Sequence, residues 1–375
     1  MVGARFADAN FFVREDLKQP LDAYRPGLSK LIFQTKLGSV LDKSDRMDKL
    51  VNDLIPMLGL DADEGIFARR AVHLAKADLV TQMVTEMTSL QGLIGGEYAL
   101  RSGEQKDVAE AISEQYRTVP KSKAGVAVAL TDRIDSLVGL FAAGLAPTGA
   151  KDPFGLRRAA IGVVQPLIAP PLGVEHAISF DLREAVKKAA KLQPIEVKDE
   201  VQTQVLDFIT GRLRVVLNES GYRYDVVDSV LAEQSANPAA AAEAVKQLQV
   251  WVGRKDWSTI LPEYARCVRI IRSAKLDDRQ RTVDDKKFVE QAERDLYQAV
   301  QSSVVHPEGG ASSRPSSVNE FLNIILKLVP SINAFFDKVL VMAEDEKVKQ
   351  NRLALVGQIA NLSTGIADLS KLEGF

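Results

Sequence analysis

Residues 125 to 141, GVAVALTDRIDSLVGLF, repeat their large apolar side chains at intervals of three and four. Because each residue of an α-helix turns by about 100°, such intervals place these side chains on one face. No segment of comparable length alternates apolar and polar residues, as a half-buried strand would. The stretch therefore predicts a helix with a buried face and favours an all-α fold built from helical bundles. The buried face consists of Leu130, Ile134, Leu137 and Phe141.

The same periodicity extends along the chain in both directions, and it is interrupted where glycine and proline cluster. Asn237 and Pro238 predict a turn followed by a helix start, since proline suits the first helical position. Further helices are predicted within residues 28–41, 46–58, 67–84, 107–116, 201–222, 224–234 and 239–252. Breaks are predicted at GLIGGEY (92–98) and at GLAPTGAKDPFG (144–155).

Two segments predict irregular connections. VVQPLIAPPLGVEH, residues 163 to 176, carries three prolines and predicts a domain boundary, after which a second helical region opens at Asp181. SSVVHPEGGASSRPSSV, residues 302 to 318, is rich in serine, proline and glycine and predicts a mobile loop. After this loop, the chain again shows helical periodicity to its end.

Composition excludes several protein classes. With 375 residues, 46% of them hydrophobic, the chain can bury a substantial core in two or three folding units. A formal charge of -2 excludes a generally basic nucleic-acid coat but not local basic patches. A single cysteine, Cys267, excludes an internal disulfide and favours a reducing compartment. The first residues resemble a domain interior rather than a signal or transit peptide, so we expect a preceding segment to be missing.

The usual signatures of catalysis are absent from the sequence. It has no P-loop, no G-x-G-x-x-G, no paired-cysteine metal motif and no G-x-S-x-G. On a helix through residues 67–84, His73 and Asp78 would lie roughly 140° apart, on the two flanks of the apolar stripe, so they would not share a metal ion. We therefore expect a structural His73 and an inert, buried Cys267. The other histidines, His176 and His306, fall in the two irregular connections.

Basic residues gather in three places, and their meaning is open at this point. One interpretation is a solvated helix face, which is common in soluble proteins. The other is phosphate contact with a folded RNA, with Tyr222 and Tyr224 stacking on bases. The three groups are Arg157 with Arg158, Lys187 with Lys188 and Lys191, and Arg266 with Arg269 and Arg272.

Six stretches, taken together and in this order, resemble the beta subunit of the bacterial-type, two-subunit glycyl-tRNA synthetase. They span nearly the whole chain, from residue 11 to residue 356. Each is a weak signal alone, whereas six in register identify the chain as a member of this family. The stretches are FFVREDLKQPL, FQTKLGSVLDKSDRM, LAKADLVTQMVTEMTSLQGLIGGEYA, DPFGLRRAAIGV, ESGYRYDVVDSVLA and FFDKVLVMAEDEKVKQNRLALV.

The resemblance implies a division of the chain and of the reaction. It implies the end of a preceding domain (1–27), an HD-like helical domain (28–180), a connecting helical region (181–257) and an anticodon-binding domain of the DALR type (258–375). Glycine activation with ATP and magnesium would belong to an alpha subunit, or to an alpha region of a fused chain. This chain would then recognise tRNA(Gly) as part of a heterotetrameric ligase, with no catalytic or cofactor-binding residue of its own.

An HD-type metal centre would be incomplete here. Such a centre needs an adjacent His-Asp pair, a preceding histidine and a later aspartate. Asp78 follows Ala77 instead of a histidine, while Asp132 resembles the later aspartate. We expect a helical scaffold that binds no metal. An HD-type metal phosphohydrolase and a helical scaffold without RNA affinity are the alternatives to the tRNA-recognising role.

The resemblance also suggests which residues meet tRNA. Phe335, Val339 and Met342 repeat at helical intervals and are expected in the core. The surrounding polar residues are expected to contact exposed bases or phosphates. The source would be a plant-like chloroplast or mitochondrion, or a bacterial cytoplasm. The tRNA-binding candidates are Arg157, Arg158, Tyr222, Arg223, Tyr224, Asp337, Glu344, Asp345, Asn351 and Arg352.

Overall fold

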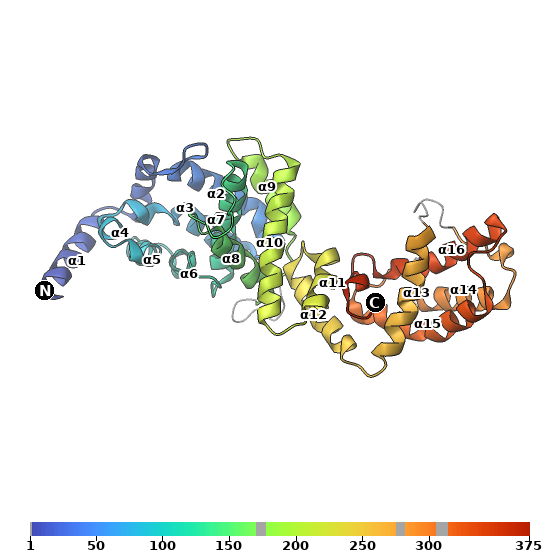
Figure 1. The fold of residues 1–375 in the computed structure, drawn as a ribbon. Coiled ribbons are helices and arrows are strands. Elements are labelled where there is room, and N and C mark those ends of the chain that lie inside the picture. Colours follow the sequence, from blue (N-terminus) through green and yellow to red (C-terminus); the bar gives the residue numbers. More distant parts are fainter. Residues whose placement is uncertain (1, 170–177, 275–281, 305–313) are drawn as a thin grey trace. The chain divides into compact units, whose positions relative to one another are not determined.

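The computed structural model describes residues 2–169, 178–274, 282–304 and 314–375, and it is built almost entirely from helices (Figure 1). This confirms the predicted all-α class. Residues cluster into two compact units, 1–216 with 236–240 and 217–235 with 241–375. His176 and His306 lie outside the described residues, as do the second half of the predicted boundary at 163–176 and part of the predicted loop. In the described ranges, no helix combines the length and apolar character that a membrane span requires.

The first unit surrounds one central helix, α7 (Lys123–Ala142). Ser122 caps its N-terminus by accepting a hydrogen bond from the amide of Gly125. The predicted stripe is buried, with Leu130, Ile134 and Leu137 fully covered and Phe141 only 7% exposed. Neighbouring helices cover α7 on several sides, so residues between the stripe positions are buried as well. The helices in contact with it are α2 (Val40–Met57), α3 (Ala62–Leu74), α6 (Lys106–Glu114), α8 (Leu156–Ile168) and α9 (Leu182–Leu192).

Shorter elements complete the first unit. Asp181 caps α9, as expected for the start of the second helical region. The remaining elements are α1 (Val2–Asp16), η1 (Leu21–Lys30), β1 (Ile32–Gln34), β2 (Gly38–Ser39), η2 (Ala77–Val80), α4 (Gln82–Glu86), η3 (Thr88–Leu90), α5 (Leu93–Arg101) and most of α10 (Asp199–Glu219).

The helix predicted for residues 28–41 is wrong, because this segment holds a small antiparallel hairpin. β1 pairs with β2, and Gly38 turns the chain with a φ of 87°. A side chain at Gly38 would be strained in this conformation. Ser39 then caps α2 in a reciprocal capping box with Asp42. The turn and the cap together end the hairpin and start the helix.

The helix predicted for residues 67–84 is interrupted. α3 ends at Leu74, η2 covers Ala77–Val80, and α4 begins at Gln82. Thr81 causes the restart, because its side chain caps α4 and its hydroxyl donates to the carbonyl of Asp78 at 2.7 Å. Val72 and Ala75, which belong to the apolar stripe of this segment, are buried. One continuous helix nevertheless does not form.

Two predicted breaks lie partly inside helices. Gly95 and Gly96 belong to α5, and only Gly92 breaks the chain, with a φ of 80°. Both helical glycines make room for neighbours, since a Cβ at Gly96 would lie 2.5 Å from the carbonyl oxygen of Ala109. Pro166 likewise lies within the last turn of α8. The break at residues 144–155 is confirmed as the connection between α7 and α8.

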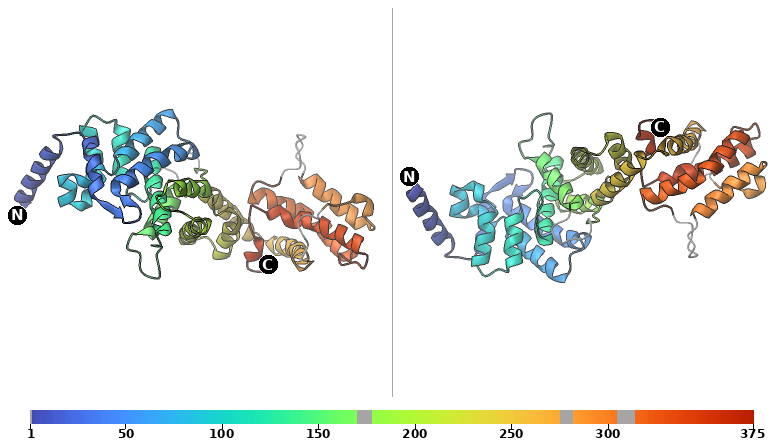
Figure 2. Two further views of the ribbon diagram at one scale, coloured as in Figure 1. Left: turned by 90° about the horizontal axis from the view of Figure 1, so that it is seen from above. Right: turned by 90° about the horizontal axis from the view of Figure 1, so that it is seen from below.

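The second unit is a helical bundle, shown from two further sides in Figure 2. Within it, α13 contacts α15 and α16, while α14 contacts α15 and α16. Asn237 caps α12 at Pro238, as predicted. The elements are α11 (Tyr224–Gln234), most of α12 (Pro238–Val252), α13 (Trp257–Ala274), η5 (Asp285–Lys287), α14 (Gln291–Val304), α15 (Val318–Lys338), α16 (Glu346–Ala360), η6 (Asn361–Ser363) and η7 (Leu369–Lys371).

Residues 339–345 form an irregular connector between α15 and α16. Phe335 and Val339 are buried, as predicted. The prediction for Met342 is wrong, because helix α15 ends at Lys338 and Met342 is 47% exposed in the connector. Leu340 is 72% exposed beside it. The connector therefore presents two apolar side chains to solvent.

Candidate functional site

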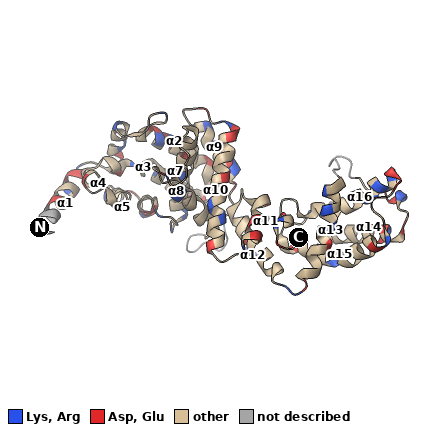
Figure 3. Ribbon diagram, viewed as in Figure 1, with Lys and Arg blue, Asp and Glu red and all other residues tan. Residues whose placement is uncertain are grey.

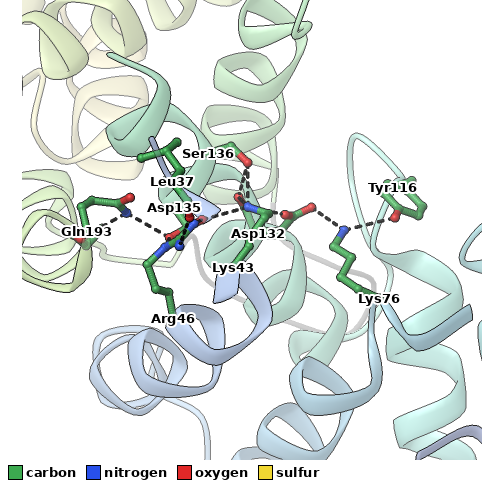
Figure 4. Close-up of polar contacts among 10 residues, drawn as sticks. Leu37, Lys43, Arg46, Lys76, Tyr116, Asp132, Asp135, Ser136 and Gln193 are labelled. Atoms are coloured by element: carbon green, nitrogen blue, oxygen red, sulfur yellow. Dashed lines mark hydrogen bonds and ion pairs between the residues drawn. The ribbon is translucent and has the colours of Figure 1, made fainter. Parts of the chain in front are cut away.

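Two buried aspartates on α7 form the centre of a charged cluster in the first unit. Figure 4 shows Asp132 and Asp135 facing basic side chains of α2 and Lys76, which lies between α3 and η2. Lys43 Nζ lies 2.9 Å from Asp132 Oδ1 and 3.0 Å from Asp135 Oδ2. Lys76 Nζ lies 2.8 Å from Asp132 Oδ2, and Arg46 Nε lies 2.8 Å from Asp135 Oδ1. Both oxygens of Asp132 are thus occupied by ammonium groups.

The cluster holds these groups in their charged forms. Burial alone would raise the pKa of Asp132, but Lys43 and Lys76 outweigh it and hold that pKa well below its usual range. Burial alone would lower the pKa of Lys76, but Asp132 and Tyr116 together raise it above its ordinary value. Removing one partner would leave an unpaired charge in the interior, which typically costs about 3–5 kcal/mol.

The residues that resemble an HD-type centre have separate partners. His73 Nδ1 lies 2.9 Å from Asp48, and its Nε2 lies 3.3 Å from Asp22. Asp78 Oδ2 accepts hydrogen bonds from the amides of Gly92 at 2.6 Å and Gly95 at 3.2 Å. In the part of the chain that the structure describes, no three histidines, cysteines or carboxylates are grouped to hold a metal ion. The absence of a bound metal stays a prediction.

Cys267 is confirmed as a buried thiol on α13. Its side chain is fully covered and has no disulfide partner. Burial raises the pKa of the thiol to about 12. The thiolate needed for nucleophilic or metal chemistry is therefore disfavoured.

The basic groups of the sequence have mixed environments, and Figure 3 shows both signs of charge on α9, α10 and the start of α16. Lys188 pairs with Asp53 at 2.8 Å and Arg266 with Glu263 at 3.1 Å. Arg158 differs, because it is exposed on α8 and forms no ion pair among the described residues. The neighbouring Arg157 donates to the carbonyl of Gly149.

The candidates around residue 223 point toward the C-terminal segment of their own unit. Arg223 pairs with Asp225 at 2.7 Å and with Glu373 at 3.3 Å. Tyr224 is 60% exposed, and its hydroxyl donates to Glu373. Tyr222 is half-buried. Of these three residues, Tyr224 is the most exposed to solvent.

Five further candidates lie in or near the connector 339–345. Asp337 precedes the connector on α15, Glu344 and Asp345 lie at its end, all three are exposed, and Asp345 caps α16. Arg352 is 7% exposed, pairs with Glu293 at 2.8 Å and donates to the carbonyl of Leu340 at 2.9 Å. This hydrogen bond holds the backbone of the connector against α16.

Asn351 precedes Arg352 on α16 and contacts a segment other than the connector. It is buried, accepts from the amide of Asp284 at 2.8 Å and donates to the carbonyl of the same residue at 3.0 Å. Asn351 and Arg352 therefore bind protein groups in this structure, while the exposed acids and the apolar pair of Leu340 and Met342 face solvent.

Comparison with known proteins identifies both parts of the chain. The family described as glycyl-tRNA synthetase beta subunit matches residues 1–232. The chain belongs to this family. A second match, described as DALR anticodon binding domain, covers residues 260–369 and coincides with the bundle of the second unit. The resemblance read from the sequence is confirmed.

Named relatives of the synthetase family match nearly the whole chain. A glycine–tRNA ligase beta subunit of Moorella thermoacetica is 37% identical over 99% of this chain and 54% of its own length. One of Aromatoleum aromaticum is 37% identical over 100% of this chain and 53% of its own length. A chloroplastic/mitochondrial glycine–tRNA ligase of Arabidopsis thaliana is 37% identical over 99% of this chain and 34% of its own length. The chain spans about half the length of the bacterial relatives.

Two basic residues of the buried cluster, Lys43 and Arg46, were not predicted from the sequence of this synthetase-family chain. Lys43 and Arg46 are 4% and 6% exposed on α2. A signal was present, because Lys43 continues the apolar spacing of Met47, Leu50 and Leu54 toward the helix start. A lysine in line with a buried stripe indicates a buried partner of opposite charge.

Proposed function

We propose that this chain is the tRNA-recognising part of a glycine–tRNA ligase. It would hold tRNA(Gly) so that the 3′ end reaches an active site in an alpha subunit or a fused alpha region, which would bind ATP and magnesium. The supporting observation is the anticodon-binding match over residues 260–369, within a bundle that exposes the connector 339–345. The compartment in the name of the Arabidopsis relative and the bacterial sources of the others support a plant-like organelle or a bacterial cytoplasm.

Neither alternative function is favoured by the site. A metal phosphohydrolase would need Asp132 as a ligand, but Lys43 and Lys76 occupy both of its oxygens. A scaffold without RNA affinity would not account for a match to an anticodon-binding domain.

Recognition of the anticodon is proposed to involve the exposed acids beside the connector. Asp337, just before the connector, and Glu344, near its end, are solvent-exposed, so their carboxylates can accept hydrogen bonds from base amino groups. Asp345 is exposed too, but it also caps α16, so its replacement would perturb the helix. The first two residues are therefore the better test positions.

The test compares binding of tRNA with a glycine anticodon and with a scrambled anticodon. The full chain should prefer the glycine anticodon, and Asp337→Ala with Glu344→Ala should reduce this preference by about tenfold, as expected for about 1.4 kcal/mol of discrimination. Glu243→Ala, which removes an exposed acid of α12, is the matched control and should leave the preference unchanged. A full chain without any anticodon preference would contradict the proposed role of this domain.

A further inference from the structure

A pocket of about 330 Å³ opens beside Asp132 in the first unit. Such a volume is within the range of pockets that hold small ligands. It is lined by α7, the start of α8, β1, and the residues that follow η3 and α6. The lining combines three aromatic rings with polar groups and two arginines. The aromatic residues are Phe33, Tyr116 and Phe154.

The charge of this pocket suits an anion. Its two arginines, Arg133 and Arg158, form no ion pair with a carboxylate in the described ranges. Arg133 instead donates to backbone carbonyls, among them that of Gly162 at 2.8 Å. Asp132 is the carboxylate among the lining residues, and two lysines already bind it. The arginines therefore lack a counter-ion that an anionic ligand would supply.

The aromatic residues suit a planar ring. Phe154 and Tyr116 are 43% and 40% exposed, and one face of the Tyr116 ring is covered by Lys76, whose Nζ lies 4.4 Å from the ring centre. Aromatic side chains of this kind stack with unpaired nucleobases, and stacking tolerates any base because every base has a π-face.

We propose that this pocket binds a single nucleotide, with the base against Phe154 and Tyr116 and the phosphate on Arg158. The same chemistry is offered by a free mononucleotide and by an unpaired nucleotide of an RNA. The pocket itself supports nucleotide binding, whereas the choice of RNA as the source rests on the proposed function. Binding involves no hydrolysis, since the proposal assigns no attacking group.

The test is equilibrium binding of the full chain to 5′-AMP, 5′-CMP, ribose 5-phosphate and a single-stranded RNA tetranucleotide. Nucleotides should bind at least tenfold more tightly than ribose 5-phosphate, because stacking of one base is worth about 1–3 kcal/mol. A tetranucleotide that binds at least tenfold more tightly than 5′-AMP would identify RNA as the source, and equal affinities would identify a free nucleotide. Equal binding of ribose 5-phosphate and 5′-AMP would overturn the proposal.

Matched variants locate the binding to this pocket. Phe154→Ala and Arg158→Ala should each weaken nucleotide binding by about tenfold. Phe11→Ala removes a similarly exposed ring of α1, and Arg69→Ala removes an exposed arginine of α3 that does not line the pocket, so both should bind as the unaltered chain does. Thermal unfolding checks that all four variants fold. Unchanged nucleotide affinity in folded Phe154→Ala would overturn the proposal, whatever the outcome of the anticodon test.

Discussion

Asp78 is a buried carboxylate whose closest partners are two backbone amides, those of Gly92 and Gly95. Its other oxygen, Oδ1, has no hydrogen-bond partner. Burial raises its pKa from the ordinary 3.8 to about 6, although the two amides and Lys76 act in the opposite direction. The sequence placed Asp78 beside a helix stripe, but its amide partners follow from the folding of residues 92–95 against it, which spacing alone does not reveal.

Replacement of Asp78 should change how stability depends on pH. Since the folded state binds the proton more tightly, the stabilising contribution of Asp78 is complete below pH 3.8 and is lost as the pH rises toward 6. Asp78→Asn does not titrate, so its unfolding free energy should rise relative to that of the unaltered chain by ~2 kcal/mol between pH 4 and pH 7. Denaturant unfolding at both pH values measures this.

An opposite trend is expected for a carboxylate with a lowered pKa. Hydrogen bonds from the Ser39 side chain and amide lower the pKa of Asp42, so its contribution is lost as the pH falls. Asp42→Asn is the control for Asp78→Asn. A pH-independent difference between Asp78→Asn and the unaltered chain would show that Asp78 titrates normally in the fold.

At the scale of elements, long helices with regular apolar spacing were predictable, and short or interrupted ones were not. The stripe of α7 identified the central helix because its burial repeats over many residues. The hairpin of β1 and β2 is too short to show a period, and the break near Thr81 depends on one side-chain cap. The two glycines of α5 resemble a helix end in the sequence but serve contact between helices.

Gly96 should be intolerant of a side chain because α5 and α6 approach closely there. A Cβ at this position would lie 1.9 Å from Ser113 Oγ and 2.5 Å from the backbone oxygen of Ala109. The hydroxyl can rotate, but the backbone can only move with its helix. We expect Gly96→Ala to lower the unfolding free energy by about 1–3 kcal/mol, as overpacking does.

Gly211→Ala is the matched control for Gly96→Ala. Gly211 also lies inside a helix, and a Cβ there would meet no atom within 4 Å. Alanine should therefore stabilise α10 by up to about 1 kcal/mol through its higher helix propensity. Chemical denaturation of both variants compares the two effects. Equal, small effects at both positions would mean that α5 and α6 are not in close contact.

At the scale of the whole molecule, the family resemblance predicted more than composition did. A formal charge of -2 and a single cysteine fit many soluble proteins. The composition does not show where one compact unit ends and the other begins, because two of these boundaries fall inside α10 and α12. The predicted four-part division stays a prediction. The individual tRNA-binding candidates stay predictions too, since buried Arg352 and exposed Glu344 looked alike in the sequence.

We expect this chain to recognise tRNA without activating glycine. The sequence has no P-loop or G-x-G-x-x-G, and the proposed function assigns ATP to an alpha region. The chain alone should therefore bind tRNA(Gly) but catalyse no glycine-dependent exchange between ATP and pyrophosphate. Phosphate contacts should make tRNA affinity fall with added salt, by about 0.7–0.9 in the log-log slope for each neutralised phosphate. Exchange by the homogeneous chain would place activation within these 375 residues, whereas salt-independent binding would remove phosphates from the contact.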